Sequence, residues 1–492
     1  MPAIPEKAAP WAPFAAILLL AAGLRWLAFS LFDITHADEL MQYVEQGHRL
    51  AFGHGLVPWE YRYGIRSLLV PDLLAAPMAI ARWFAPQGLA PLIAARTLFA
   101  ALCLGAVPAA FWLGSLQSRL HALAAMFVAA VWAESVLMGV QALSEPFATA
   151  AGCAGTAALL RSRDQARAAF LAGFLLALMV LLRMQYAAYG APLALMVLGR
   201  NFAAWRRVIA GALPALAIGA AVDLAAGMAP FAWIGNNFRM NIGDGRSTWF
   251  GVADSAAYLH FIAGRMFPAA IPVALLALAS GKAYRPVLIA AIVNIAAHSV
   301  IAHKEYRFIW LSIFLIVVLA AIGSVSLMLR LREERGARAA TLPMAMGALC
   351  LGWAALSIVT YQLSGGVDSF RKGRHFAESA LEAARRPGTC GIALPSWHRQ
   401  HLAPAYLPRR VELFLLPDDA DRGRAPFPQA LTAAADALIL TGRAAPPAPY
   451  RLVRCRQGTI GKACLWLREG GCRTSPASAA FTYQAVMEAD DM

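Results

Sequence analysis

Long apolar runs recur along this sequence, and they constrain its fold more than any other feature. About 20 such residues cross the hydrocarbon core of a bilayer. Only 14% of the residues are charged and 60% are hydrophobic, whereas a soluble domain carries roughly 25% charged residues. The sequence therefore predicts a polytopic α-helical membrane protein with about eleven transmembrane helices. We expect these spans near residues 12–32, 90–114, 121–139, 145–160, 168–183, 186–199, 208–225, 258–279, 285–301, 307–328 and 341–362.

Basic residues in the short connections predict the orientation, because cytoplasmic loops are enriched in lysine and arginine. Four connections carry most of them, near residues 161–167, 200–207, 282–285 and 330–338. If these four face the cytoplasm, the connections 226–257 and 302–306 and the segment after 363 face outward. The net charge of +15 then reflects topology and contact with anionic lipid, and it does not require a nucleic-acid partner.

Two N-terminal segments need separate treatment. Residues 66–84 are apolar enough to span, but a crossing there would invert every later basic loop, so we expect an interfacial helix. The first apolar run is long and contains Arg25, and we expect it to remain as an anchor. These choices predict a transmembrane catalytic domain over 1–362, whose first extracytoplasmic loop covers 33–89 and contains interfacial helices.

The composition changes near residue 363, where charge and proline increase. VELFLL and DALILT are typical of strands, and residues 374–386 are typical of an amphipathic helix, so we expect a small extracytoplasmic α/β domain over 363–492. Four of the seven cysteines lie in it, and three lie within apolar spans. In an oxidising compartment these four predict up to two disulfides with three possible pairings, while four reduced thiols are the alternative.

The loop after the first span is unusually dense in charged and aromatic residues. Residues 36–67 read HADELMQYVEQGHRLAFGHGLVPWEYRYGIRS, and the first part is typical of a helix with Asp38 and Glu39 in its first turn. Two acids at a membrane boundary are a candidate acid/base pair; a helix cap is the simpler alternative. Carboxylates beside Trp59 suit a sugar, whose C–H surface packs on aromatic rings.

A second motif, HKEYR, lies at a predicted outer connection between two spans. His303, Lys304 and Arg307 are suited to binding a phosphate through charge-assisted hydrogen bonds. Alternatively, these charges only end two helices at the interface. Basic residues on an outward loop run against the topology rule, which favours the phosphate hypothesis.

Ionisable residues within the spans usually line a cavity or pair with one another. Glu145 with Arg183 is a candidate structural ion pair. The outer loop 226–257 carries amides, including Asn237 and Asn241, that suit a glycan or headgroup; a solvated loop is equally compatible. The sequence contains no recognisable phosphate-binding loop, dinucleotide motif or nucleophile elbow, so any sugar donor must arrive already activated.

These motifs resemble glycosyltransferase family 22, the lipid-linked mannosyltransferases, with the closest likeness to its GPI mannosyltransferases. HADE, Gln42, Glu-x-x-His, Phe-Gly-x-Gly, Trp-Glu and Gly-x-Arg-Ser match its first signature, and HKEYRF and LSEP match two later ones. The resemblance covers roughly residues 12–325. Ala37, Pro58 and Tyr61 depart from the pattern, and the alanine- and arginine-rich composition suggests a bacterial chain.

The resemblance implies a GT-C glycosyltransferase fold and an inverting transfer of mannose, or a related hexose, from a polyprenyl-phosphate carrier to a glycan or glycolipid. It implies Asp38 as general base with Glu39 second, and His303, Lys304 and Arg307 at the donor phosphate, with no metal and no cofactor. The expected location is the bacterial inner membrane, with the active site facing the periplasm. Other substrate-binding candidates are His36, Gln42, Glu45, His48, Trp59, Glu60, Arg66, Glu145, Asn237 and Asn241.

Two other functions are compatible with the sequence. One is a GT-C transferase that modifies lipid A or protein. The other is a transporter or flippase for a lipid-linked glycan, which would bind its substrate at the bilayer midplane between pseudo-repeats. The acids lie near a membrane boundary and no repeat is visible, which favours an enzyme.

Overall fold

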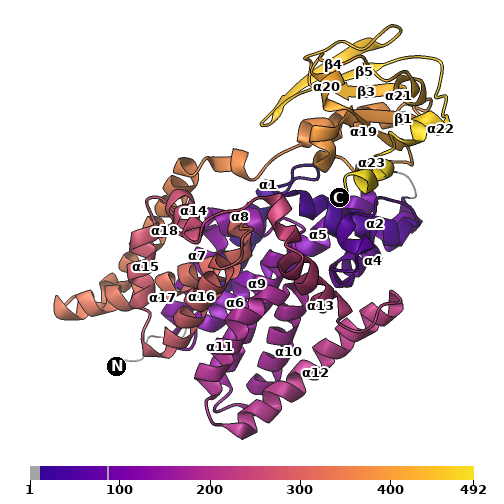
Figure 1. Ribbon diagram of the computed structural model, residues 1–492. Coiled ribbons are helices and arrows are strands. Elements are labelled where there is room, and N and C mark those ends of the chain that lie inside the picture. The colour runs from indigo at the N-terminus through magenta and orange to yellow at the C-terminus, as the bar shows by residue number, and fades with distance from the viewer. Residues whose placement is uncertain (1–10, 86–87, 492) are drawn as a thin grey trace. The chain divides into compact units, whose positions relative to one another are not determined.

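The structure, a computed structural model, describes residues 11–85 and 88–491 (Figure 1). The chain forms two compact units, each assembled from several segments. Unit 1 comprises residues 1–29, 100–140 and 144–366, and unit 2 comprises 30–99, 141–143 and 367–492. The division into domains 1–362 and 363–492 remains a prediction.

Unit 1 is helical. Its α-helices are α1 (Ala12–Ala28), α6 (Ala106–Gly114), α7 (Arg119–Val131), α8 (Ala133–Met138), α9 (Ser144–Arg161), α10 (Ala166–Leu182), α11 (Ala187–Leu198), α12 (Phe202–Ala225), α13 (Ala232–Phe238), α14 (Ala257–Arg265), α15 (Ala270–Leu278), α16 (Arg285–Ser299), α17 (Trp310–Glu334) and α18 (Leu342–Leu363). Helix α17 packs against α7, α9, α15 and α16, and 89% of its apolar window is buried. A helix that is apolar on every face is suited to this central position.

Four helices in the described ranges are long and apolar enough to cross a membrane, or five if a bent pair counts as one span. Four more apolar helices are shorter. These helices confirm an integral membrane protein, while the expected number of about eleven crossings remains a prediction. The passing segments are Ala90–Gly114, Phe202–Ala225, Tyr306–Glu334 and Leu342–Leu363, and the bent pair is Ala257–Arg265 with Ala270–Leu278.

Glycines allow close packing of helices in unit 1. A Cβ added to Gly173 of α10 would lie 1.8 Å from the carbonyl oxygen of Val208 in α12, and one added to Gly211 would lie 1.8 Å from that of Phe170. Gly323 of α17 has the same relation to α15. Small residues are expected where apolar helices pack in a membrane, because attraction there depends on close van der Waals contact.

Unit 2 begins with the loop that the sequence analysis singled out. A π-helix over Glu39–Val44 continues into α2 (Glu45–Phe52), followed by α3 (Trp59–Arg62) and α4 (Leu69–Phe84). Helix α5 (Ala90–Leu104) begins in unit 2 and ends in unit 1. The helix expected over 36–52 is therefore present, with a π-helical first part. Helix α4 occupies the segment expected to lie at the membrane interface, and that location stays a prediction.

The C-terminal part of unit 2 is a mixed five-stranded sheet with order β2-β1-β3-β5-β4. Its strands are β1 (Gly391–Pro395), β2 (Glu412–Leu416), β3 (Ala437–Leu440), β4 (Arg451–Gly458) and β5 (Gly461–Leu467), and its helices are α19 (Arg374–Ala384), α20 (Asp418–Asp421), α21 (Gln429–Ala434), α22 (Pro476–Ala479) and α23 (Tyr483–Ala489). Strands β2, β1 and β3 are parallel, whereas β5 pairs antiparallel with β3 and β4. Helix α19 packs against the sheet (Figure 1).

The sheet confirms the α/β character expected for this region. Strands β2 and β3 are the VELFLL and DALILT segments, and α19 is the amphipathic helix expected over 374–386. The structure contains two disulfides, Cys390–Cys472 and Cys455–Cys464, which selects one of the three pairings. The three cysteines in the apolar spans are free, as expected.

Candidate functional site

Asp38 and Glu39 are adjacent in sequence but lie in different surroundings. Glu39 is fully buried; its Oε1 accepts from Arg96 Nη2 at 2.6 Å and from the Ala142 backbone N–H at 3.0 Å. Burial raises the pKa of the Glu39 carboxyl, and the Arg96 charge opposes that shift. These contacts give Glu39 a structural function in unit 2.

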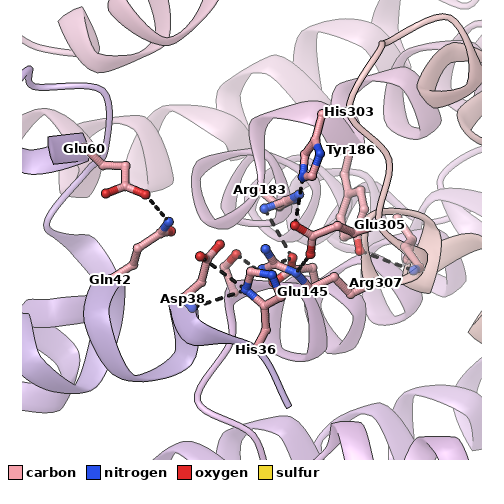
Figure 2. A network of polar contacts seen from close by, with 12 residues as sticks. His36, Asp38, Gln42, Glu60, Glu145, Arg183, Tyr186, His303, Glu305 and Arg307 are labelled. Carbon is pink, nitrogen blue, oxygen red and sulfur yellow. Dashed lines mark hydrogen bonds and ion pairs between the residues drawn. The ribbon is translucent and has the colours of Figure 1, made fainter. Parts of the chain in front are cut away.

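Asp38 is more accessible, with 17% of its side chain exposed. Its backbone N–H donates to His36 Nδ1 at 3.2 Å, and its Oδ1 lies 3.2 Å from the same nitrogen (Figure 2). Asp38 directly precedes the π-helix. A partly accessible carboxylate beside an imidazole can accept a proton from a ligand.

Glu60 provides a second carboxyl near Asp38. Gln42 Nε2 donates to Glu60 Oε1 at 2.6 Å (Figure 2), and Tyr61 Oη donates to the Gln42 carbonyl at 2.7 Å. Burial, followed by the negative charge of Asp38, raises the pKa of Glu60 to about 7, while Arg66 opposes the shift. The structure thus brings together the predicted residues His36, Asp38, Gln42, Glu60 and Arg66 within unit 2.

Glu45 and His48 lie farther along the same helix. Glu45 is fully buried, and its two oxygens accept from the backbone N–H groups of Leu56 at 2.7 Å and Ala405 at 2.9 Å. Burial raises the pKa of Glu45 to about 8 and lowers that of His48 to about 4. Trp59 is buried at the start of α3. The contacts of Glu45 tie segments of unit 2 together, and its binding of a substrate stays a prediction.

Glu145 is the centre of a buried network in unit 1. Its Oε1 lies 3.2 Å from Arg183 Nη1 and 3.0 Å from Arg307 Nη1 (Figure 2), and Ser144 Oγ donates to its Oε2 at 3.2 Å. Glu145 follows Ser144 in the first turn of α9. The ion pair expected between Glu145 and Arg183 is present, and Arg307 extends it.

The HKEYR motif forms the other part of this network. Arg307 Nε donates to Glu305 Oε2 at 2.6 Å, and His303 Nε2 lies 2.9 Å from Glu305 Oε1 (Figure 2). Lys304 is buried, and its Nζ donates to two backbone carbonyls at 2.5 and 2.9 Å. Glu305 therefore contacts two of the three cations that the sequence analysis expected at the donor phosphate.

The amides of the predicted outer loop lie in the segment after α12. Asn237 is buried in α13, and Asn241 lies in a π-helix where Ser247 Oγ donates to its backbone carbonyl at 2.7 Å. Asp223 near the end of α12 accepts from the Phe231 backbone N–H at 2.7 Å, which fixes the start of this segment. A ligand for either amide remains a prediction.

The sequence analysis did not single out Arg96 or Glu305, whereas it named Arg183 as a candidate structural partner of Glu145. In the structure Arg96 pairs with Glu39, and Glu305 connects His303 to Arg307. The position of Arg96 inside an apolar span was a signal in the sequence, since such charges usually pair with an acid. Which acid pairs with Arg96, and which cations pair with Glu305, depended on the tertiary structure.

Unit 2 contains another group of titratable residues, the histidine cluster of His375, His398 and His401 around Phe376. Burial lowers the pKa of His398 to about 4 and that of His401 to about 3, and it also lowers that of His375. Within the described residues, each ring has one buried nitrogen without a hydrogen-bond partner. These rings are therefore held in the neutral form.

One grouping of possible metal ligands occurs in the described parts of the chain, comprising Cys390, Asp436 and Cys472. The two cysteines are joined in a disulfide, so they do not offer thiolates. Asp436 Oδ1 accepts from the backbone N–H groups of Cys390 and Gly391 at 3.2 and 3.1 Å. This grouping stabilises the start of β1 and does not fit a metal centre.

Comparison with solved structures identifies the fold. ArnT from Cupriavidus metallidurans aligns in its apo state over 92% of this chain and 97% of its own, with a TM-score of 0.59 and 12% identity. ArnT bound to undecaprenyl phosphate aligns over 95% and 100%, with a TM-score of 0.58 and 12% identity. The Archaeoglobus fulgidus oligosaccharyltransferase aligns over 81% and 64%, with a TM-score of 0.51 and 14% identity. These similarities confirm the GT-C fold.

Comparison of sequences identifies the family. GPI mannosyltransferase 3 from Trypanosoma brucei brucei is 32% identical over 91 residues, which are 16% of this chain and 16% of the relative. The chain thus matches only about one sixth of that curated relative's length. The model of the Alg9-like mannosyltransferase family, in contrast, matches residues 16–366. The chain therefore belongs to the Alg9-like mannosyltransferase family.

Proposed function

We propose that this protein is an inverting glycosyltransferase that moves mannose, or a related hexose, from a polyprenyl-phosphate carrier to a glycan or glycolipid hydroxyl. The family match over residues 16–366 is the observation that carries this proposal. A GT-C neighbour bound to undecaprenyl phosphate supports the choice of carrier.

Asp38 is the proposed general base. Its accessible carboxylate takes the proton of the acceptor hydroxyl, while the hydroxyl oxygen forms a bond to the anomeric carbon of the donor. The bond from that carbon to the phosphate oxygen breaks, and the polyprenyl phosphate leaves with the bonding electrons. Glu39 does not suit this function, because Arg96 and a backbone N–H bind its buried carboxylate.

His303, Lys304 and Arg307 are proposed to bind the departing phosphate. The phosphate replaces Glu305 as the partner of His303 and Arg307. Glu145 orients the Arg307 guanidinium by accepting a hydrogen bond from Nη1, whereas Nε is the nitrogen that donates to Glu305. In the described parts of the chain, hydrogen bonds to two backbone carbonyls use two of the three donors of the Lys304 ammonium, which leaves one for a phosphate oxygen.

The remaining candidates are proposed to recognise sugar hydroxyls and to shape the site. Glu60, with a pKa near 7, donates or accepts a proton at neutral pH, and Gln42 orients it. The complete set is His36, Gln42, Glu45, His48, Trp59, Glu60, Arg66, Glu145, Asn237 and Asn241.

The reaction is proposed to take place on the periplasmic side of a bacterial inner membrane. The basic connections support this orientation, and two disulfides suit an oxidising compartment. Reporter fusions after residue 86 test it: outward exposure supports the interfacial placement of α4 and the orientation that depends on it. A cytoplasmic reporter contradicts both.

The decisive experiment is Asp38→Asn in the purified full-length protein. We expect the transfer of radiolabelled mannose from polyprenyl-phosphate mannose to a total glycolipid extract to fall by about 10² to 10⁴. Binding of the lipid donor should persist, because the substitution leaves the phosphate-binding cations in place. Persistence of donor binding without transfer also separates a transferase from a transporter.

Asp164→Asn is the matched control. Asp164 is exposed between α9 and α10, and the same change of charge there should leave transfer unchanged. Transfer by Asp38→Asn at a rate near that of the parent protein contradicts the assignment of the base. A loss of transfer in the control as well attributes the effect to net charge.

A further inference from the structure

A cavity of about 370 Å³ lies within unit 2, and neither Asp38 nor Glu60 lines it. One wall is formed by α2 and the turn that follows it, including His48 and His54. Arg82 of α4 and the segment 404–413 complete the wall. The cavity thus uses residues of the Glu-x-x-His and Phe-Gly-x-Gly motifs. The proposed function gives the first motif only a part in recognising sugar hydroxyls and shaping the site, and neither motif takes part in the proposed proton transfer or phosphate binding.

Short hydrogen bonds hold the walls together. Glu45 accepts from the N–H groups of Leu56 and Ala405 on two sides of the cavity. The Gly88 N–H donates to the Pro408 carbonyl at 2.9 Å. Because these links are internal to unit 2 and Glu45 is fully buried, the cavity is preformed, which reduces the entropy lost on binding a ligand.

The rim of the cavity is positively charged. Arg82 and Arg410 both lie close enough to His54 for their charges to lower its pKa, after the effect of burial. Arg410 is exposed, and none of the residues in the described ranges forms an ion pair or a hydrogen bond with its side chain. Arg82 contacts the Phe52 ring, 5.0 Å from its centroid. One acid, Glu412, also lines the cavity.

The inner surface combines aromatic and polar residues. Phe52 lines the cavity, with His48 stacked on its ring, and Tyr483 contributes only a buried edge, being 1% exposed. The Gln484 amide is already engaged, because its Oε1 accepts from the Val57 N–H at 2.9 Å and its Nε2 donates to the Val57 carbonyl and to Glu488 Oε1 at 3.2 and 2.8 Å. His48 is buried there with Nδ1 unpartnered among the described residues, so a hydroxyl that reaches it gains a hydrogen bond.

The cavity lies at some distance from the proposed base. Asp38 and His48 are ten residues apart on one helical segment, which corresponds to about 15 Å in an α-helix and slightly less where the helix is π-helical. A group bound beside His48 is therefore not the sugar that reacts at Asp38.

We propose that this cavity is an acceptor subsite that binds an acidic sugar, carrying phosphate or carboxylate, beyond the residue that is glycosylated. The anion pairs with the Arg82 and Arg410 guanidinium groups, and the sugar ring occupies the cavity beside His48. The inference rests on the proposed transferase function. Binding energy from such a remote group can be used to orient the reacting hydroxyl.

The test is binding of soluble probes to the full-length protein in detergent, followed by ligand-observed NMR titration. Mannose 6-phosphate and glucuronate should bind, while mannose should bind at least tenfold more weakly. Arg410→Gln and Arg82→Gln should each weaken mannose 6-phosphate binding about tenfold or more, because each removes charge-assisted hydrogen bonds. Arg454→Gln, at an exposed position of β4, is the matched control and should have no effect.

Three results overturn the proposal. Equal affinity for mannose and mannose 6-phosphate excludes a requirement for the anion. Equal affinity for inorganic phosphate and mannose 6-phosphate excludes recognition of the sugar. Unchanged binding in Arg410→Gln and Arg82→Gln places the probe elsewhere.

A further variant separates this inference from the transferase proposal. Asp38→Asn should lose transfer and retain mannose 6-phosphate binding. If Asp38→Asn retains transfer, the base assignment fails but the subsite stands on its binding data. If the Arg410 and Arg82 variants bind normally while Asp38→Asn is inactive, the subsite fails and the transferase assignment stands.

Discussion

Replacing Glu39 with glutamine should destabilise the protein far more than replacing its neighbour Asp38 with asparagine. Glu39 Oε1 accepts from Arg96 at 2.6 Å, and the two side chains are 0% and 2% exposed. Glutamine keeps an oxygen for the Ala142 N–H, but it leaves the Arg96 guanidinium buried without a counter-charge. Loss of one partner from a buried ion pair costs about 3–5 kcal/mol.

That cost is large compared with the total stability of a domain, about 5–15 kcal/mol. A loss of 3 kcal/mol lowers the ratio of folded to unfolded protein roughly 150-fold. Asp38→Asn should change the free energy of unfolding less than Glu39→Gln does, because 17% of the Asp38 side chain is exposed and water partly screens its charge. The comparison thus separates the structural function of Glu39 from the catalytic function proposed for Asp38.

The assay is reversible unfolding in mixed micelles titrated with a denaturing detergent, with transfer activity measured on the same preparations. Glu39→Leu combined with Arg96→Met should recover most of the loss, since replacing a whole buried pair with apolar residues is often neutral. A loss below 1 kcal/mol in Glu39→Gln, or no recovery in the double variant, refutes the reasoning. A stable but inactive Glu39→Gln instead assigns Glu39 to the chemistry.

Three further outcomes are expected. Glu145→Gln should reduce transfer at least tenfold and weaken binding of the polyprenyl-phosphate donor, because the Arg183 and Arg307 guanidinium groups lose the carboxylate that orients them. Donor binding equal to that of the parent protein contradicts this role of Glu145. Gly55→Ala should destabilise unit 2 by more than 1 kcal/mol in the same unfolding assay. The glycine has a φ of +150°, and an added Cβ would lie 2.5 Å from Glu45 Oε1. Unchanged stability of this variant refutes the prediction. The histidine cluster should make the protein acid-labile: the folded-state pKa values of His398 and His401, about 4 and about 3, lie below the unfolded value near 6.5. Their contribution to stability is therefore complete above pH 6.5 and decreases as the pH falls toward 4, by roughly 2 kcal/mol for each of these two rings between pH 6.5 and 5. Thermal unfolding at pH 7 and pH 5 measures this, and replacing the three histidines with glutamine should reduce the difference.

The apolar runs alone determined the protein class. A chain with so few charges cannot cover a water-facing surface, and its helices must bury their backbone polar groups internally in lipid. The strands VELFLL and DALILT and the amphipathic helix over 374–386 were also predictable, because alternating and helical periodicities are local properties. Helix bounds and the π-helical start of the segment after Asp38 were not, since packing shifts ends and inserts residues without changing the apolar pattern.

The sequence by itself was sufficient to propose which residues carry the chemistry: the acids of the first loop and the basic HKEYR motif. Only the tertiary structure decided how those charges are paired. Asp38 and Glu39 are nearly indistinguishable in sequence, and what separates them is Arg96, which lies 57 residues away. The choice among three disulfide pairings likewise depended on the order of strands. Pairing of charges and cysteines is a contact between distant segments, and its energy depends on burial, which the order of residues does not specify.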